Sequence, residues 1–234
     1  MKILAIDSSG MTASCAIAQE DRILVEFNVN NKKTHSQTLL PMIDTIKNIL
    51  EADINEIDAV AISKGPGSFT GLRIGSATAK GIALAIDKPV IEISSLEAMA
   101  YQIFGTDAVI CPLMDARRSQ VYTSLFEYRD DVFGRISDDE PMDILELVAK
   151  VNGLGRKVIF LGDGVPVYSE TIARNIEVPY LFAPAFQNRQ RAAALAILAF
   201  EYAKRNEFTD PDMHRPEYLR LSQAERERMN RQGT

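Results

Sequence analysis

Hydrophobic and polar positions along residues 1–105 follow two periods, and each change of period marks a change between strand and helix. Short apolar runs at residues 2–6, 12–18 and 23–29 predict three strands joined by polar turns. Helix-spaced segments then alternate with further apolar runs. The remaining predicted elements are helices at 36–51, 71–86 and 95–104 and strands at 57–62 and 89–93. The order βββαβαβα predicts one complete α/β lobe.

The opening of this pattern recurs after residue 106, where an apolar run again ends in an aspartate and a polar turn. The elements predicted there are strands at 108–114, 121–128, 132–135 and 157–161 and helices at 142–151 and 189–205. Two similar openings indicate a duplicated fold. We therefore expect a first lobe at 1–105, a smaller second lobe at 106–215 and a charged, exposed tail at 216–234.

Composition narrows the class of protein. The chain is 46% hydrophobic and 25% charged, which is typical of a globular protein. It has no signal-peptide pattern and no apolar run long enough to span a bilayer, so we expect a cytoplasmic location without membrane contact. Cys15 and Cys111 lie in apolar runs and are predicted to be buried free thiols. Neither His35 nor His214 has a ligand-spaced neighbour, which argues against a His/Cys metal site. The net charge of −6 gives no general attraction to nucleic acid, so RNA contact would need a local basic patch or a partner.

A Gly-rich segment at residues 63–75 separates a predicted strand from a predicted helix. Its glycines are Gly65, Gly67, Gly71 and Gly75. Glycine permits positive φ angles and close backbone approach, and ligands of α/β sheets bind at the carboxyl ends of strands. The helix start could also attract an anion, although the spacing matches neither a Walker A loop nor a dinucleotide fingerprint. The alternative is a tight structural turn.

Two aspartate turns are further candidates for chemistry. Asp7, with Ser8, Ser9 and Thr12, could hold a phosphate or magnesium, but a hairpin turn capped by polar side chains is the favoured interpretation. In the second half, Asp115 could bind an anion together with Arg117 and Arg118. Such a pair at a hairpin is more often structural or part of an interface. His35 is expected to cap its helix or meet a partner, and residues 162–164 are expected to form a strand-to-helix turn.

Five motifs in order along the chain resemble the TsaB (YeaZ) family, whose members are partner subunits in bacterial synthesis of N6-threonylcarbamoyladenosine in tRNA. These motifs are Ile3-Leu-Ala-Ile-Asp7-Ser-Ser, His35-Ser-Gln-Thr-Leu-Leu-Pro41, Gly65-Pro-Gly-Ser-Phe-Thr-Gly-Leu-Arg-Ile-Gly75, Asp115-Ala-Arg-Arg-Ser-Gln-Val-Tyr122 and Pro216-Glu-Tyr-Leu-Arg220. The resemblance implies an actin-like α/β fold, as in sugar kinases and Hsp70, with two lobes of which the second is truncated. It also implies binding to TsaD, recruitment of the ATPase TsaE, and tRNA contact only within the complex.

The catalytic relative TsaD binds a metal through two histidines at the start of a helix. If Leu96 and Glu97 align with the centre of that motif, Ser95 and Met99 occupy the histidine positions. The resemblance then implies that the metal site is lost. The second lobe also lacks the Gly-Gly pair that shapes the adenine pocket of nucleotide-binding relatives. Glu97 could act as a general base, but no nucleophile or histidine accompanies it.

Two predicted helices, at 36–51 and 71–86, carry the apolar surfaces that a partner could bind. The first has a helix-spaced stripe, whereas Leu40 points to another side, and the second has small residues that permit close helix approach. Packing on the chain's own sheet is the usual explanation of one stripe. A helix that is apolar on more than one face needs a second cover. The resemblance implies that these helices pair with TsaD. The candidate interface residues are Leu39, Leu40, Met42, Ile43, Ile46 and Ile74.

The sequence therefore predicts a non-catalytic scaffold subunit without a cofactor. The alternatives are a glycoprotease-like peptidase, a residual ATPase and a stand-alone RNA-binding module. A peptidase is disfavoured because the chain shows neither a metal-spaced histidine pair nor a Ser/His/Asp order, and the acidic charge balance disfavours the RNA-binding module. A homodimer through the same helices stays open.

Overall fold

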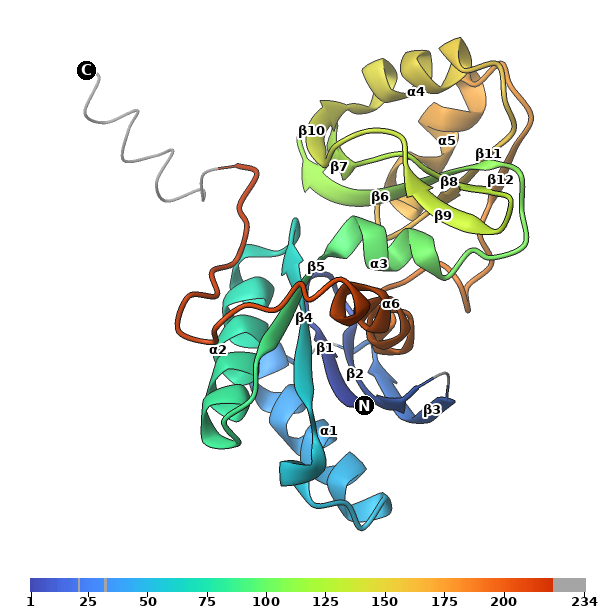
Figure 1. The fold of residues 1–234 in the computed structure, drawn as a ribbon. Coiled ribbons are helices and arrows are strands. Elements are labelled where there is room, and N and C mark those ends of the chain that lie inside the picture. The colour runs from blue at the N-terminus through green and yellow to red at the C-terminus, as the bar shows by residue number, and fades with distance from the viewer. Residues whose placement is uncertain (21, 32, 221–234) are drawn as a thin grey trace.

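The computed structural model describes residues 1–20, 22–31 and 33–220, which form two lobes stacked one above the other (Figure 1). The first lobe is built on a mixed sheet with the strand order β3-β2-β1-β4-β5. Its strands are β1 (Lys2–Asp7), β2 (Ala13–Gln19), β3 (Arg22–Val29), β4 (Ala59–Gly65) and β5 (Val90–Ser94). β1 lies at the centre, antiparallel to β2 and parallel to β4.

Helices cover both faces of this sheet (Figure 1). One face packs against α1 (His35–Ile49) and α2 (Phe69–Ala85), which follow β3 and β4. The other face packs against α6 (Ala192–Lys204), an Ala-rich helix from near the end of the chain. A short 3-10 helix, η1 (Ile54–Glu56), leads from α1 to β4. Small side chains in α2 and α6 let both helices approach the sheet closely.

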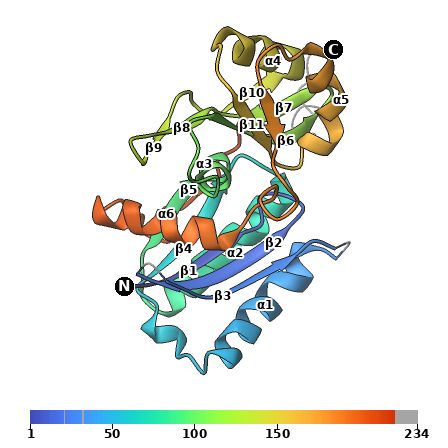
Figure 2. The same cartoon turned by 90° about the vertical axis from the view of Figure 1, so that its right-hand side faces the viewer.

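The second lobe has its own sheet with the strand path β10-β7-β6-β11-β12, and β8 and β9 branch from β6. Its strands are β6 (Val109–Arg117), β7 (Gln120–Thr123), β8 (Phe126–Arg129), β9 (Val132–Arg135), β10 (Glu140–Asp143), β11 (Val158–Leu161) and β12 (Tyr180–Phe182). The helices α4 (Ile144–Gly153) and α5 (Val165–Asn175) cover one face of it. α3 (Ser95–Tyr101) lies between the lobes in both views (Figure 2).

The predicted order βββαβαβα is the observed order of the first lobe. The predicted boundaries differ from the structure at α6, which they place in the second lobe but which packs on the first sheet. The predicted strand 121–128 is two strands, because Ser124 and Leu125 leave the ladder to bond with Ser137. Cys15 and Cys111 are buried and free, as predicted, and burial raises the pKa of each thiol to about 12.

The segment at residues 209–220, here called the strap, runs back along the first lobe. The backbone of Thr209 pairs with that of Val90 in β5, and the side chain of His214 contacts that of Glu92. Its end crosses to the second lobe, where the Arg220 guanidinium donates to the Ala116 carbonyl oxygen at 3.1 Å. The predicted tail at 216–234 is therefore bound to the fold over its first five residues, and the rest of it lies outside the described residues.

Candidate functional site

A cleft of about 810 Å³ lies between the two lobes and is lined by residues from both predicted aspartate turns and from the Gly-rich loop. The first lobe contributes the turn after β1, the Gly-rich loop and the start of α1. The second lobe contributes the β6–β7 hairpin and the turn after β11, and the strap contributes its last residues. From the predicted sites, the lining includes Ser9, Gly67, Gly71, Ile74, Asp115, Arg117 and Tyr122.

The turn after β1 uses its polar groups within the chain itself. The Asp7 carboxylate accepts hydrogen bonds from the backbone N–H and the hydroxyl of Ser9, at 2.9 and 2.7 Å. The Ser8 hydroxyl donates to the Gly71 carbonyl oxygen at 2.8 Å. Asp7, Ser8, Ser9 and Thr12 are all buried. The Thr12 hydroxyl has no hydrogen-bond partner among the described residues. This arrangement supports the polar-capped turn over a phosphate or magnesium site.

The protonation of Asp7 points the same way. Burial raises the pKa of its carboxyl above the ordinary value of 3.8, and the hydrogen bonds from Ser9 offset only part of that increase. A carboxyl removed from water is a poor ligand for magnesium, which binds ionised oxygens and keeps several of its own waters.

The Gly-rich loop closes over this turn and explains why the turn is buried. The Ser68 N–H donates to the Ser9 carbonyl oxygen at 2.7 Å. A Cβ atom at Gly67 would overlap that same oxygen, and one at Gly71 would overlap the carbonyl oxygen of Ser8. The glycines therefore let two backbones touch. The loop acts here as a structural cover for the first turn.

The other two predicted glycines, Gly65 and Gly75, lie at the two ends of the Gly-rich segment. Gly65 has a φ of +125°, and a Cβ there would also overlap the carbonyl oxygen of Glu217 in the strap. A Cβ at Gly75, in the second turn of α2, would overlap the hydroxyl of Ser8. Both positions therefore require glycine for close packing.

The turn after β6 has a different character. Asp115 accepts a hydrogen bond from the backbone N–H of Arg117 at 2.8 Å and another from the Tyr168 hydroxyl at 3.0 Å. The Arg117 and Arg118 side chains are exposed, and neither forms an ion pair with Asp115 or with any other described residue. These bonds favour a structural turn at Asp115, and the predicted pairing of its carboxylate with the Arg117 or Arg118 side chain is not seen among the described residues.

Asp163 joins this second turn, in the strand-to-helix turn that the sequence predicted before α5. Its carboxylate accepts the backbone N–H of Asp115 at 3.2 Å. Burial raises the pKa of Asp163 above 3.8, and the charge of Asp115 adds to this, whereas Arg189 opposes it. The meeting of the two aspartates was not visible in the sequence, where they lie 48 residues apart.

His35 does not cap α1, in contrast to one of its two predicted roles. Thr34 is the N-cap residue, and its N–H donates to the Gln37 side chain at 3.3 Å. The His35 ring instead contacts the Gly10 carbonyl oxygen through Nε2 at 2.9 Å, while its buried Nδ1 has no partner among the described residues. His35 thus ties α1 to the first turn.

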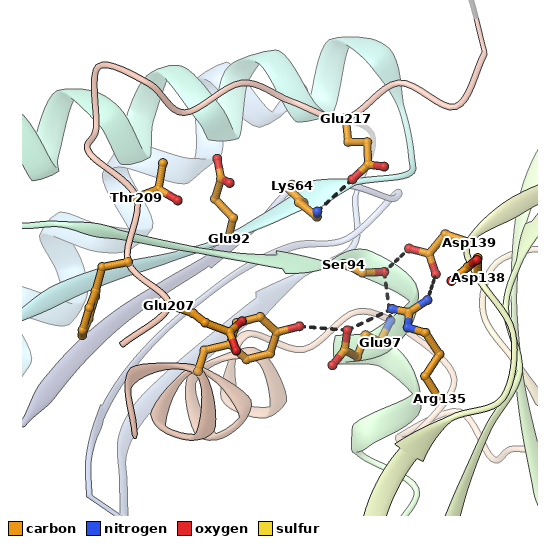
Figure 3. A pocket seen from close by; sticks show the side chains of 12 residues that line it. Lys64, Glu92, Ser94, Glu97, Arg135, Asp138, Asp139, Glu207, Thr209 and Glu217 are labelled. Atoms are coloured by element: carbon orange, nitrogen blue, oxygen red, sulfur yellow. Dashed lines mark hydrogen bonds and ion pairs between the residues drawn. The ribbon is translucent and has the colours of Figure 1, made fainter. Parts of the chain in front are cut away.

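A second, polar cavity of about 560 Å³ lies beside α3 and contains Glu97 (Figure 3). The Glu97 carboxylate accepts hydrogen bonds from Arg135 at 2.9 Å and from the Tyr202 hydroxyl at 3.0 Å. Because Arg135 is the last residue of β9, its ion pair with Glu97 links α3 to the second lobe, and Arg135 also contacts Asp139. The carboxylate that could have served as a general base is therefore held in an ion-pair network, which sequence spacing alone did not reveal.

Ser95 and Met99, which the resemblance led us to align with a metal-binding histidine pair, are both buried. The Ser95 hydroxyl lies 2.6 Å from that of Ser63, and Met99 packs between the lobes. Among residues 1–20, 22–31 and 33–220 there is no group of three or more His, Cys, Asp or Glu side chains arranged to hold a metal ion.

The predicted interface residues divide into two sets. Leu39, Met42, Ile43 and Ile46 are buried in the core of the first lobe, under the sheet side of α1. These four form the stripe that packs on the chain's own sheet, so the apolar spacing marked a core face. Leu40 is 56% exposed and Ile74 is half-buried. Only these two can meet a partner without unfolding the lobe.

Comparison with known proteins places this site in a family. A protein-family model described as TsaD, tRNA N6-adenosine threonylcarbamoyltransferase, matches residues 23–228. The tRNA threonylcarbamoyladenosine biosynthesis protein TsaB of Bacillus subtilis is 33% identical over 225 residues, which cover 96% of each chain. The chain belongs to the TsaB (YeaZ) family. The Escherichia coli TsaB protein is also 33% identical, over 62% of this chain and 63% of its own.

Solved structures confirm the actin-like fold of this TsaB-family chain. YeaZ from Pseudomonas aeruginosa superposes with a TM-score of 0.79 at 24% identity, over 93% of this chain and 99% of its own. Component A of (R)-2-hydroxyglutaryl-CoA dehydratase from Acidaminococcus fermentans gives a TM-score of 0.50 at 12% identity, over 87% of this chain and 99% of its own. No helix among the described residues is long and apolar enough to cross a membrane.

Proposed function

We propose that this TsaB-family chain is a non-catalytic scaffold that binds TsaD through the outer faces of α1 and α2. In that complex it supports transfer of a threonylcarbamoyl group to the tRNA adenosine beside the anticodon, and TsaE joins the assembled pair. The observation that carries the proposal is the exposure of large apolar side chains on these two adjacent helices. Leu40 and Ile49 on α1 are 56% and 60% exposed, and Leu84 on α2 is 49% exposed.

The shape of this face suits a helical partner. α2 presents Ala77 and Gly81 to solvent between its larger residues, and nothing lies within 4 Å of the position of a Cβ at Gly81. Small exposed residues let a second helix approach closely, and covering the large apolar side chains beside them removes apolar surface from water, which favours association. A second copy of this chain could use the same face, so the partner must be tested directly.

The state of the polar groups supports the absence of catalysis. Asp7 is sealed under the Gly-rich loop, and Glu97 is bound to Arg135 and Tyr202. A peptidase or an ATPase would need at least one of these carboxylates to reach a substrate, water or metal. For this reason neither enzyme activity is proposed.

The test compares leucines that differ in position but not in chemistry. Leu40→Glu should keep the circular dichroism spectrum and Tm of the unmodified chain but weaken TsaD binding by about 100-fold or more, because the carboxylate would be desolvated without a partner. Light scattering of the purified chain mixed with TsaD measures this. Reconstituted tRNA modification should fall in parallel.

Two control variants separate loss of TsaD binding from a general effect of the added charge and from unfolding. Leu145→Glu carries the same change on α4, at a leucine 51% exposed, and should bind TsaD normally. Leu39→Glu changes the neighbouring buried residue and should lower Tm strongly. Normal TsaD binding by folded Leu40→Glu, Ile74→Glu and Leu84→Glu variants would show that the partner binds elsewhere.

A further inference from the structure

Four cations at the mouth of the cleft have no counter-charge in the described part of the chain. Lys33 precedes α1, Arg117 and Arg118 form the tip of the β6–β7 hairpin, and Arg220 ends the strap. Three of them line the same cleft, and Arg118 is the direct neighbour of Arg117. None forms an ion pair with a described residue. The guanidinium of Arg220 bonds the Ala116 carbonyl oxygen, so it lies beside the hairpin.

The acidic residues of the cleft do not cancel these charges. Glu217 is paired with Lys64 at 2.9 Å. Asp115 and Asp163 are half-buried and accept hydrogen bonds from backbone and tyrosine donors, and burial raises the pKa of Asp163. The carboxylates thus sit in the cleft wall, whereas Lys33 and Arg117 are exposed at its mouth.

The hairpin holds its arginines outward at a conformational cost. Arg117, Arg118 and Ser119 have φ angles of +62°, +57° and +59° in succession. A left-handed conformation costs a non-glycine residue about 1 kcal/mol or more. Backbone strain of this kind is concentrated at functional sites, and here its result is that two unpaired guanidinium groups face solvent.

An aromatic surface lies on the other wall of the cleft. The ring of Tyr218 packs against that of Phe69 in a tilted arrangement, with centroids 4.4 Å apart and an interplanar angle of 33°, and the Arg73 guanidinium lies 4.0 Å from the Phe69 centroid. Tyr218 is 38% exposed, so its ring is accessible. Proteins that bind single-stranded nucleic acid combine unpaired cations for the backbone with accessible rings on which bases stack.

We propose that this cleft mouth binds single-stranded RNA, with Lys33, Arg117, Arg118 and Arg220 on the phosphates and Tyr218 under a base. The inference rests on the proposed function, because the RNA would be the loop of the tRNA that the complex modifies. It places RNA contact on this chain itself, beside the face proposed for TsaD, despite the net charge of −6.

The experiment measures binding of the full chain, alone and with TsaD, to a fluorescein-labelled RNA hairpin whose loop is that of an anticodon arm. Anisotropy is followed between about 50 and 200 mM salt. The Arg117→Ala, Arg118→Ala double variant should bind about tenfold more weakly, and the slope of log K against log salt should fall by about 1.4, or about 0.7 for each lost phosphate contact. Tyr218→Ala should weaken binding with little change of slope.

The matched control is the Arg22→Ala, Lys157→Ala double variant, which loses the same charge at two exposed sites away from the cleft and should bind like the unmodified chain. Unchanged affinity and slope in the arginine double variant would overturn the proposal. Saturation of the cleft by inorganic phosphate alone would do so too, since the ligand would then be a small anion.

Light scattering with TsaD separates this result from the scaffold proposal. The arginine double variant should bind TsaD normally, and loss of that binding would assign the arginines to the protein interface and reject the RNA site. Conversely, normal TsaD binding by the folded Leu40→Glu, Ile74→Glu and Leu84→Glu variants would refute the scaffold interface and leave the RNA measurements valid.

Discussion

The β1–β2 and β6–β7 turns begin alike, with a buried strand that carries an aspartate at or near its end and returns as an antiparallel strand, yet they have opposite environments. In the first turn Asp7, Ser8 and Ser9 are almost fully buried, and their polar groups bond within the chain. In the second turn the aspartate is half-buried, and the following arginines extend into solvent.

The difference comes from what lies on each turn. The Gly-rich loop covers the first, and its glycines allow backbone contact without a layer of side chains between. Within the described part of the chain no such loop covers the second turn, where the cleft and the strap lie instead. A repeated motif thus gives a packing element in one lobe and an open, charged surface in the other, so the chemistry of one copy does not predict that of its duplicate.

The largest effect should follow from separating the first turn from its cover. Gly71→Ala places a Cβ against the Ser8 carbonyl oxygen and should destabilise the fold by about 3 kcal/mol. Gly81→Ala, on the same helix but in open space, should instead stabilise it by about 1 kcal/mol. Urea denaturation of both variants measures the contrast. Equal stabilities would mean that the cover is a tolerant surface turn.

The next effect concerns the pH dependence of stability. Because the pKa of Asp7 is raised in the folded state, its ionised form opposes folding, and its contribution to stability improves as pH falls through that raised pKa toward 3.8. Asp7→Asn keeps an acceptor for Ser9 and removes the buried charge. Its Tm should exceed that of the unmodified chain at neutral pH, and the gap should narrow in acid.

Asp44→Asn, on the exposed side of α1, controls for the loss of one negative charge. A lower Tm for Asp7→Asn at neutral pH, with Asp44→Asn unchanged, would mean that the ionised carboxylate stabilises the first turn. The first turn would then contain a charged aspartate that stabilises it, and its burial would no longer distinguish its chemistry from that of the second turn.

The smallest effect is expected in the second turn, from relief of its backbone strain. Ser119→Gly should stabilise the fold by about 1 kcal/mol, because glycine adopts a φ of +59° without a steric penalty. Ser119→Ala removes the hydroxyl without relieving the backbone and should give no gain. A gain in both variants would assign the effect to the side chain, and a gain in neither would show that this turn is unstrained.

Sequence patterning was sufficient for elements whose signal is local. α1 was predicted at 36–51 and spans His35–Ile49, and the four glycines of the loop stood out because they cluster between a predicted strand and a predicted helix. Sequence patterning failed for elements whose structure depends on contacts with residues far away in the sequence. β10 contains Pro141, which reads as a break but is tolerated in an edge strand, and α5 starts with Val165-Pro166, a proline position that helices accept.

The site residues show the same limit. Spacing identified an apolar stripe on α1 but could not show that Leu39 faces the sheet while Leu40 faces solvent in the fold. The ion pair of Glu97 with Arg135 joins residues 38 apart, and the one between Lys64 and Glu217 joins the Gly-rich loop to the strap. Such pairs depend on how the lobes are stacked, which no local pattern encodes.

The path of α6 has a consequence for how the chain is made. One face of the first sheet, with Ile3, Ala61 and Ile91, is covered by a helix that begins at residue 192. During synthesis that face stays bare until most of the second lobe has left the ribosome. The first lobe therefore cannot finish folding as a separate unit before the second lobe has been synthesised. A chain truncated before residue 192 would expose this apolar face to water and to aggregation, even with every strand of the first sheet present.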